Sequence, residues 1–403
     1  MKKYFRKNGN IYPISKRRAV AVMSVALAIM MLLSLCTFSV SAEEEAVQVL
    51  SAPVPDCKSA ILMEASTGSV LYEKNADEAL PPASVTKIMT LLLVMEAIDA
   101  GKINYSDIVT ASAHACSMGG SQIYLKEGEQ MTVEDLVKSV VISSANDAAV
   151  ALAEFVSGSE ATFVSQMNER ARQLGMKNTV FENTNGLDDT AKAHLTSARD
   201  IAIMSRELIK HKKITEYSSI WMDTIRDGSF GLTNTNRLVR FYKGATGLKT
   251  GSTSKAGFCI SATAEREGMT LICIIMGSPT RDTRNASATA LLDWGFTNYS
   301  VYKSPDINID PVKVLGGKIS RCELEYDSFS AIIDKKDLNS MEYVIELPKT
   351  VTSPINKGDI LGIIRYRSGD KEIGTVNIYA KEKVVKIRYV DIILRILCAI
   401  SIN

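Results

Sequence analysis

This 403-residue chain has few histidines and a small net charge, and each of these features argues against one class of function. The three histidines, His114, His194 and His211, form no H-E-x-x-H or H-x-x-E-H motif. This disfavours a zinc hydrolase, and we predict no metal site. The formal net charge of +2 leaves no basic excess, so nucleic acid is not an expected partner.

Cysteine is also sparse, and its placement argues against a disulfide scaffold. The cysteines are widely scattered and show no C-x-x-C spacing. The sequence leaves any pairing undetermined, and buried free thiols are the simplest expectation. Beyond the N-terminal segment they are Cys57, Cys116, Cys259, Cys273, Cys322 and Cys398.

The first 42 residues have the pattern of an export signal. A basic segment precedes an apolar run from Ala19 to about Val40, and the small residues Val40-Ser41-Ala42 stand before the acidic Glu43. We therefore predict a secretory signal peptide over 1–42 and an exported protein. The alternative is an uncleaved membrane anchor, because the apolar run is rather long.

The end of the chain carries a second pattern that is typical of membrane association. In the stretch 383–402, the charged residues Arg388, Asp391 and Arg395 share one side of a helical wheel, and aliphatic residues fill the other side. The charges interrupt the stretch too often for a membrane span, so we predict an amphipathic helix that lies on the membrane surface. A helix docked on its own domain is the alternative.

Hydrophobic periodicity predicts an α+β domain over residues 43–300. Its expected order is a hairpin at 59–73, a block of helices, a second hairpin at 258–276, and a helix at 286–294 that Gly295 ends. Within the block, helices are expected at 88–98, 132–142, 147–155, 160–174 and 197–209.

A change of pattern beyond about Tyr299 predicts a second, small all-β domain over 301–380. Short alternating stretches are separated there by Gly, Pro, Asn and Asp turns, and no cluster of reactive residues is evident. The expected architecture is thus an antiparallel sheet with a helical block, then the all-β domain, then an amphipathic helix over 381–403. The alternating stretches are 312–314, 343–347, 360–366 and 372–379.

Three short motifs follow one another along the chain: Ser84-Val85-Thr86-Lys87, Ser144-Ala145-Asn146 and Lys249-Thr250-Gly251. Each is weak alone, since Ser252-Thr253-Ser254-Lys255 also fits S-x-x-K and Lys126-Glu127-Gly128 also fits K-x-G. Their expected places are a helix start, a joint between two helices and a strand. Together they predict one shared site for acyl transfer by a serine.

The first motif supplies a nucleophile and its base. A serine hydroxyl needs a nearby base, and residues i and i+3 of a helix share a face, which sets Lys87 beside Ser84. Lys87 must be neutral to act, and burial beside the apolar helix 88–98 together with the charge of Lys249 would lower its pKa. The alternative is an ordinary helix N-cap with an exposed lysine.

The other two motifs add groups that can position a substrate. Ser144 can pass a proton and Asn146 can hold a substrate amide, although ordinary helix capping would also explain both residues. Lys249 and Thr250 can hold a carboxylate, and Gly251 would let a substrate backbone lie close to the strand. Their alternative is a strand-entry turn with a solvated lysine.

On these motifs the chain resembles the penicillin-recognising serine enzymes. It is most similar to the low-molecular-mass penicillin-binding proteins that act as D-alanyl-D-alanine carboxypeptidases, and the resemblance covers nearly the whole chain. Further stretches that carry it are 82–90 (PASVTKIMT), 185–187 (NGL), 194–200 (HLTSARD), 234–236 (NTN), 247–251 (GLKTG) and 256–259 (AGFC).

The resemblance implies a β-lactamase/transpeptidase-like catalytic domain that removes the terminal D-alanine from peptidoglycan stem pentapeptides, without a cofactor. It implies an acyl-enzyme on Ser84, Lys87 as base, Ser144 as proton relay, and an oxyanion hole from the backbone N–H groups of Ser84 and Ser252. β-Lactams are expected as inhibitors, and the expected location is the outer face of the cytoplasmic membrane or the cell wall. Substrate contacts are implied for Asn146, Lys249, Thr250, Gly251, Ser252 and Arg284.

Two alternatives stay open from the sequence. A class A β-lactamase shares the three motifs, but it needs a deacylating glutamate in an E-x-x-x-N loop, and Glu182-Asn183-Thr184-Asn185 has the wrong spacing. It also has no use for an all-β domain and an anchor. The second alternative is a catalytically silent wall-binding scaffold, which the intact Ser84, Lys87, Ser144 and Lys249 disfavour.

Overall fold

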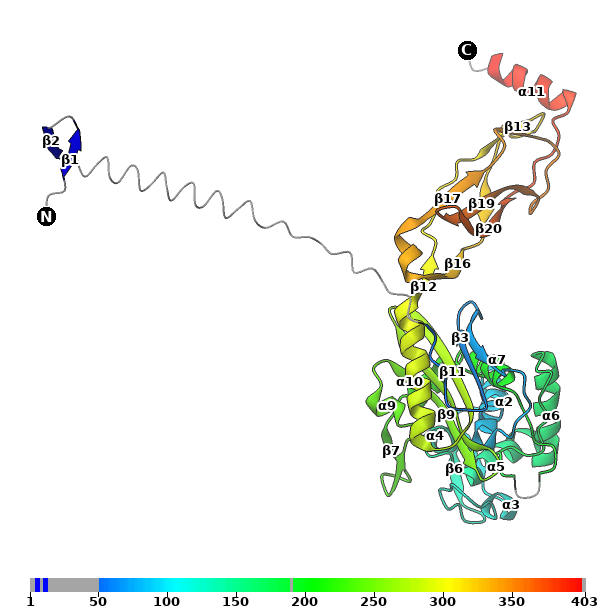
Figure 1. The fold of residues 1–403 in the computed structure, drawn as a ribbon. Helices are drawn as coiled ribbons and strands as arrows, with labels where there is room; N and C mark the ends of the chain where they lie inside the picture. The colour runs from blue at the N-terminus through cyan, green and yellow to red at the C-terminus, as the bar shows by residue number, and fades with distance from the viewer. Residues whose placement is uncertain (1–3, 8–9, 14–50, 189–190, 401–403) are drawn as a thin grey trace. The chain divides into compact units, whose positions relative to one another are not determined.

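The computed structural model describes residues 4–7, 10–13, 51–188 and 191–400 (Figure 1). The chain separates into two compact units, Met1–Gln48 and Val49–Asn403. In the first unit, β1 (Tyr4–Lys7) and β2 (Asn10–Pro13) pair as an antiparallel hairpin. The apolar run and cleavage site predicted for the signal peptide, at 19–42, lie outside the described residues.

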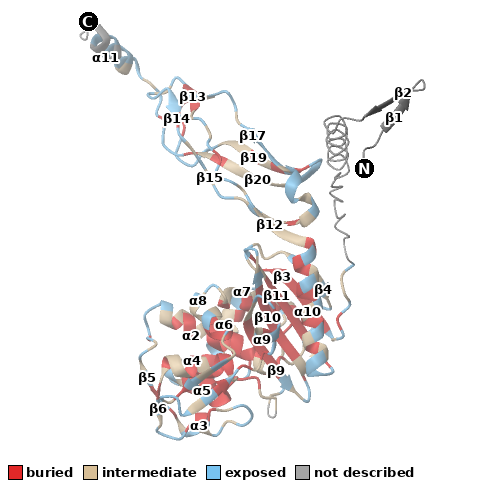
Figure 2. Ribbon diagram, turned by 90° about the vertical axis from the view of Figure 1, so that its left-hand side faces the viewer, coloured by how far each residue is buried: buried red, intermediate tan, exposed pale blue. Residues whose placement is uncertain are grey.

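A five-stranded antiparallel sheet in the order β4-β3-β11-β10-β9 forms the centre of the second unit. Alternate residues face opposite cores, so that Ile61 and Ile274 pack on one side and Leu62 and Ile275 on the other. Burial of both faces explains why the central parts of the inner strands consist mainly of apolar residues (Figure 2). The two predicted hairpins are confirmed. The strands are β3 (Ser59–Glu64), β4 (Val70–Lys74), β9 (Ala245–Thr253), β10 (Gly257–Arg266) and β11 (Met269–Ser278).

One face of the sheet is covered by α10 (Arg281–Asn298). The prediction that Gly295 ends this helix is wrong, because the helix continues to Asn298. A Cβ atom on Gly295 would lie 2.7 Å from Leu271 Cδ1 and 2.8 Å from Leu62 Cδ2. The glycine therefore lets the helix approach the sheet closely, which offsets its intrinsic cost of about 1 kcal/mol within a helix.

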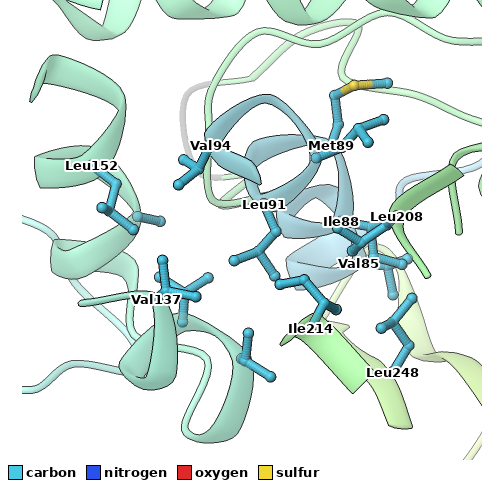
Figure 3. Close-up of a cluster of buried hydrophobic side chains, with 14 of the residues drawn as sticks. Val85, Ile88, Met89, Leu91, Val94, Val137, Leu152, Leu208, Ile214 and Leu248 are labelled. Atoms are coloured by element: carbon cyan, nitrogen blue, oxygen red, sulfur yellow. The ribbon is translucent and has the colours of Figure 1, made fainter. Parts of the chain in front are cut away.

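The opposite face of the sheet packs against the block of helices. Its central helix is apolar on nearly every side, and Leu91 of this helix lies in a core that also contains Val137, Leu152 and Leu208 from neighbouring helices (Figure 3). Each helix predicted for the block is confirmed, with ends that differ by a few residues. The helices are α2 (Lys87–Asp99), α4 (Val133–Ile142), α5 (Asn146–Ser157), α6 (Glu160–Gln173) and α7 (Ala198–Leu208).

Side-chain caps explain where three of these helices begin. The side-chain oxygens of Thr132, Ser159 and Ser197 each accept a hydrogen bond from the backbone N–H three residues later. Each cap satisfies an N–H group that has no partner within the helix.

Several short elements are not predicted from the sequence, and two of them, β8 and α9, contribute Thr233 and Phe241 to the cleft described below. They are too short to show a hydrophobic period, and their places depend on contacts with the larger helices. They are α3 (Ala113–Cys116), α8 (Lys212–Ser218), α9 (Leu238–Phe241), the hairpin of β5 (Ile108–Thr110) with β6 (Gln130–Thr132), and the hairpin of β7 (Met222–Ile225) with β8 (Phe230–Thr233).

The predicted all-β part follows α10 directly. It contains a four-stranded sheet in the order β15-β20-β19-β17, whose core includes Ile364, Ile378 and the stacked rings of Tyr366 and Phe329. Smaller pairings link β12 with β16, and β13 with β14 and β18. A 3-10 helix, η2 (Lys335–Ser340), precedes β17. The strands are β12 (Tyr299–Lys303), β13 (Val312–Leu315), β14 (Arg321–Cys322), β15 (Leu324–Tyr326), β16 (Ser330–Asp334), β17 (Met341–Glu346), β18 (Thr350–Thr352), β19 (Ile360–Ser368) and β20 (Lys371–Ala380).

The C-terminal helix α11 (Tyr389–Ile400) starts later than the predicted residue 383. The segment before it stays extended, because Val384 pairs with Ile355 and Lys386 pairs with Gly317. Within the described residues, no helix has the length and apolar character that a membrane crossing requires.

Candidate active site

The nucleophile candidate Ser84 lies in a tight turn that leads directly into α2. This turn is the 3-10 helix η1 (Ala83–Thr86), and its first residue, Ala83, has a left-handed φ of +50°. Such a conformation is unfavourable for a residue with a side chain, and it is kept where surrounding contacts enforce it. Ser84 remains partly exposed, while Lys87, the first residue of α2, is fully buried.

The Lys87 amine has three close polar neighbours. Its Nζ atom lies 2.8 Å from Ser84 Oγ, 2.5 Å from Asn146 Oδ1 and 2.7 Å from the carbonyl oxygen of Asn185. Burial holds the pKa of Lys87 well below its ordinary value, the charge of Lys249 lowers it further, and Asp147 opposes both effects.

These contacts suit a neutral amine. A neutral lysine has two N–H hydrogens and one lone pair, and the two acceptors Asn146 Oδ1 and Asn185 O account for the hydrogens. The lone pair is then left for the hydroxyl proton of Ser84. The arrangement can therefore withdraw a proton from Ser84, which is what a serine nucleophile requires.

Asn146 is held from both sides at the start of α5. Its Nδ2 donates to the carbonyl of Gly119 at 2.7 Å, while its Oδ1 accepts from Lys87. The neighbouring Asp147 carboxylate accepts from the backbone N–H groups of Ile123 and Leu125. The loop around Gly119 is thus fixed against α5, and Asn146 orients the amine of Lys87.

Ser144 lies in the joint between α4 and α5, as the sequence predicts. Its φ of +65° is left-handed, so the chain turns sharply between the two helices at this residue. Its side chain is 4% exposed and lines the same cleft as Ser84.

Strand β9 brings the third motif to the cleft. Lys249 is 1% exposed, and its Nζ donates to the carbonyl of Thr250 at 3.0 Å. Burial lowers the pKa of Lys249 to about 7, and the nearby charge of Arg284 adds to this effect. Thr250 Oγ1 donates to Thr235 Oγ1 at 2.8 Å, so the hydroxyl of Thr250 is held at the cleft wall.

Gly251 has a packing role that the sequence does not suggest. A Cβ atom at this position would lie 2.7 Å from the backbone nitrogen of Ser84 and 3.0 Å from that of Val85. The absent side chain thus faces the η1 turn and lets β9 pack tightly against the nucleophile. Gly251 also lines the cleft, as does the exposed Ser252 that follows it.

Arg284 reaches the cleft from α10. It is 3% exposed, and its guanidinium donates to the carbonyl of Cys259 at 3.3 Å. Burial lowers the pKa of Arg284 to about 10, with a further contribution from the charge of Arg281. The cleft has a volume of about 670 Å³. Its walls are formed by Ser84, Ser121, Ser144, Trp221, Thr233, Asn234, Thr235, Arg237, Phe241, Thr250, Gly251, Ser252, Arg281 and Arg284.

The structure thus brings all the site residues named from the sequence to one place. Six of them line the cleft directly, while Lys87, Asn146 and Lys249 are buried close to it. In the described part of the chain, no group of three potential metal-binding side chains lies close enough together to hold an ion. The six that line the cleft are Ser84, Ser144, Thr250, Gly251, Ser252 and Arg284.

Sequence reasoning gave no role to the loop that carries Asn185. Asn183 Oδ1 accepts from Gly186 N at 2.7 Å and so shapes this loop. A Cβ atom on Gly186, whose φ is +85°, would lie 1.8 Å from the carbonyl oxygen of Ala83. The loop therefore packs directly on the nucleophile turn. A backbone carbonyl that receives a lysine hydrogen has no side-chain signature, so no motif could have marked Asn185 for this role.

His194 is another residue without an assigned role. Its Nδ1 accepts from the backbone N–H of Glu182 at 3.0 Å, so its Nε2 carries the hydrogen and donates to Thr86 Oγ1 at 2.7 Å. Thr86 Oγ1 in turn donates to the carbonyl of Ala83 at 2.8 Å. Burial lowers the pKa of His194 to about 4, which keeps the ring neutral. This chain of contacts stabilises the turn that holds Ser84.

Two family models match the chain. The model for D-alanyl-D-alanine carboxypeptidase matches residues 46–280, and the model for the C-terminal domain of penicillin-binding protein 5 matches residues 296–386. The chain is 44% identical over 347 residues to D-alanyl-D-alanine carboxypeptidase DacF of Bacillus subtilis, a match that covers 84% of this chain and 89% of that protein. It is 36% identical over 338 residues to D-alanyl-D-alanine carboxypeptidase DacC of Escherichia coli, covering 81% and 84%.

The chain is also similar to solved structures of penicillin-binding proteins. Penicillin binding protein 5 from Haemophilus influenzae superposes with a TM-score of 0.75 at 32% identity, covering 84% of this chain and 100% of that one. Penicillin-binding protein D2 from Listeria monocytogenes in the ampicillin-bound form superposes with a TM-score of 0.56 at 33% identity, covering 60% and 98%.

Replacing Gly186 by alanine tests whether the loop supports the turn. We expect Gly186→Ala to lower the free energy of unfolding by roughly 2–4 kcal/mol, because a left-handed φ and a collision with Ala83 O add together. Gly158→Ala is the matched control, since Gly158 has a φ of +78° but nothing within 4 Å of its Cβ position. Urea denaturation measures both variants. Equal losses would mean that the loop does not press on the turn.

Proposed function

The chain belongs to the D-alanyl-D-alanine carboxypeptidase family, and from this premise we propose how its own residues carry out the reaction. It is a serine-type, penicillin-binding D-alanyl-D-alanine carboxypeptidase, which releases the terminal D-alanine from peptidoglycan stem peptides. DacF and DacC are both named as D-alanyl-D-alanine carboxypeptidases, and the β-lactamase alternative is not retained.

We propose that Ser84 is the nucleophile and Lys87 its general base. The observation that carries this proposal is the separation of 2.8 Å between Lys87 Nζ and Ser84 Oγ, with the amine fully buried. Ser84 Oγ attacks the carbonyl carbon between the two D-alanines, and its proton moves to Lys87 Nζ. The backbone N–H groups of Ser84 and Ser252 stabilise the negative oxygen that develops.

The intermediate then collapses to an acyl-enzyme. The C–N bond breaks, and the departing amine takes a proton that originates on Lys87 and passes through Ser144, which lines the same cleft. D-Alanine leaves, and a water molecule attacks the ester carbon while its proton goes to Lys87. The bond between the carbonyl carbon and Ser84 Oγ then breaks, and Lys87 returns the proton to Ser84 Oγ. The shortened peptide leaves with a new C-terminal carboxyl group, which loses its own proton to water.

Three cationic or hydroxyl groups are proposed to hold the terminal carboxylate of the substrate. Thr250 and Arg284 line the cleft, and the buried amine of Lys249 on β9 interacts electrostatically with Arg284. Asn146 is proposed to contact a substrate amide, because an amide nitrogen has two hydrogens and Gly119 takes one of them within the described residues. When the substrate peptide is bound through its C-terminal carboxylate, the scissile bond lies next to Ser84.

A covalent penicillin adduct tests the nucleophile. We expect one penicillin per chain, found by mass spectrometry on the peptide that contains Ser84, and none in Ser84→Ala. Lys87→Ala should acylate at least about 100-fold more slowly, since general-base catalysis contributes on this scale. Thermal melting of both variants is the control for folding. Rapid turnover of penicillin without a lasting adduct would contradict this prediction.

The pH dependence tests the two lysines together. As pH falls, Lys87 gains a proton and stops acting as a base; as pH rises through about 7, Lys249 loses its charge and binds a carboxylate less well. We therefore expect a bell-shaped profile of kcat/KM whose alkaline limb lies near pH 7. A substrate with an amidated C-terminus should keep the acidic limb and lack the alkaline one. Identical alkaline limbs for both substrates would exclude this role for Lys249.

We further propose that the protein is exported by residues 1–42 and held at the outer face of the cytoplasmic membrane by α11. The support lies in the exposed side chains of α11, which include Val390, Ile393 and Ile396. Asp391 instead forms an ion pair with Lys318 at 3.3 Å, and its side chain is 10% exposed. The apolar side chains thus stay outward, as an interfacial helix requires. The side chain of Arg395, assigned to the polar side from the sequence, lies outside the described set.

Vesicle binding tests this attachment. The protein should co-sediment with vesicles that contain anionic lipid, and Ile393→Asp/Ile396→Asp should weaken the partition at least about tenfold, because two apolar contacts are replaced by charges. Val344→Asp/Ile360→Asp is the control, since both residues are similarly exposed but lie on β17 and β19. Equal effects of the two double variants, or none, would contradict the assignment of α11.

A further inference from the structure

Two arginines in the cleft have no role in the mechanism proposed above. Arg237 precedes α9 and is exposed, and Arg281 is the exposed first residue of α10. Both line the same cleft as Ser84. Within the described part of the chain, neither guanidinium forms an ion pair or a side-chain hydrogen bond. Two cations are therefore directed at one cleft without an anion to balance them.

The lining of this cleft is strongly one-sided in charge. It contains Arg237, Arg281 and Arg284, and none of its described lining residues is acidic. The positive charges of Arg281 and Arg237 both lower the pKa of Arg284, and each outweighs the opposing effect of Asp282. Like charges held together in this way favour the binding of an anion. One carboxylate at Thr250 and Arg284 accounts for only part of this charge.

The positions of Arg237 and Arg281 indicate which part of a bound substrate they would contact. Arg237 stands two residues after Thr235, whose hydroxyl accepts from Thr250, and both extra arginines act electrostatically on Arg284. Thr250 and Arg284 are the groups proposed to hold the terminal carboxylate. An anion bound by Arg237 and Arg281 therefore belongs to the residue that carries this carboxylate, which is the leaving residue.

We propose that Arg237 and Arg281 form a second anion subsite, which favours substrates whose leaving residue carries a carboxylate in addition to its terminal one. This inference rests on the proposed function and extends it to a class of leaving group: D-amino acids, or peptides joined through them, that have a second acidic group. The bond changes stay those of acylation, since the C–N bond breaks and the amine of the acidic residue leaves with a proton. The second carboxylate takes no part in the bond changes and contributes only to binding.

Peptides that differ at the last residue test the subsite. Acetylated peptides ending in D-Ala-D-Glu and D-Ala-D-Gln have nearly the same shape and differ in one charge. We expect wild-type kcat/KM to favour D-Glu over D-Gln by roughly three- to tenfold at low salt, as partly exposed charge-assisted contacts allow. In Arg237→Gln/Arg281→Gln this ratio should fall to about one. Release of the D-amino acid is measured by chiral chromatography.

A matched variant separates the subsite from general attraction by positive charge. Arg240 follows on α9 and lies over the rings of Trp221 and Phe241, but it does not line the cleft. Arg240→Gln removes one positive charge near the cleft and should keep the D-Glu preference. The proposal is overturned if wild type shows no preference, if the double variant keeps it, or if Arg240→Gln loses it equally.

Binding measurements keep the subsite testable apart from the chemistry. Calorimetry with Ser84→Ala gives the affinity of the D-Glu and D-Gln peptides without turnover, and the same ratio and the same loss in the added arginine variants are expected. A chain that binds with this preference but cleaves no D-Ala-D-Ala peptide would refute the proposed function and keep the subsite. A chain that cleaves D-Ala-D-Ala but binds both peptides equally would refute the subsite alone.

Discussion

The site depends on one buried amine. Lys87 is fully enclosed, and its three polar neighbours come from η1, from α5 and from the loop that carries Asn185. Burial of a charged ammonium without a carboxylate contact would be strongly unfavourable, so the fold favours the neutral amine. The unfolded chain binds a proton there and the folded chain does not. The site therefore costs stability at neutral pH, and this cost decreases as pH rises towards 10.5.

Close backbone packing holds these segments together. Gly251 lets β9 lie against the backbone of Ser84, and Gly186 lets the Asn185 loop lie against Ala83. The left-handed conformations of Ala83 and Ser144 occur where the chain is held from both sides. The large sheet and α10 support the site; Ser84 and Ser144 lie on turns, while Lys87 and Lys249 lie on α2 and β9. The unfavourable backbone conformations of Ala83 and Ser144 are thus offset by packing of the surrounding segments.

The sequence predicts the central hairpins and the long helices because their apolar residues recur at a clear period. It also groups Ser84, Lys87, Ser144 and Lys249, because their motifs are expected at a helix start, in a joint between two helices and on a strand. It fails at Gly295, where a glycine serves packing instead of ending a helix. It gives no role to the Asn185 carbonyl or to the contact between His194 and Thr86, because these depend on tertiary contacts across distant segments. Arg237 and Arg281 carry no motif, and only the shared cleft reveals them.

Direct titration of Lys87 is the measurement that bears most closely on this arrangement. Carbon-13 labelling at the lysine ε position, with Lys87→Ala to assign the signal, gives the pKa by nuclear magnetic resonance. The structure predicts a neutral amine at pH 7, with a pKa well below 10.5 that rises when Lys249 is replaced by a neutral residue. A Lys87 that is still protonated at pH 9 in the free enzyme would contradict its assignment as the base.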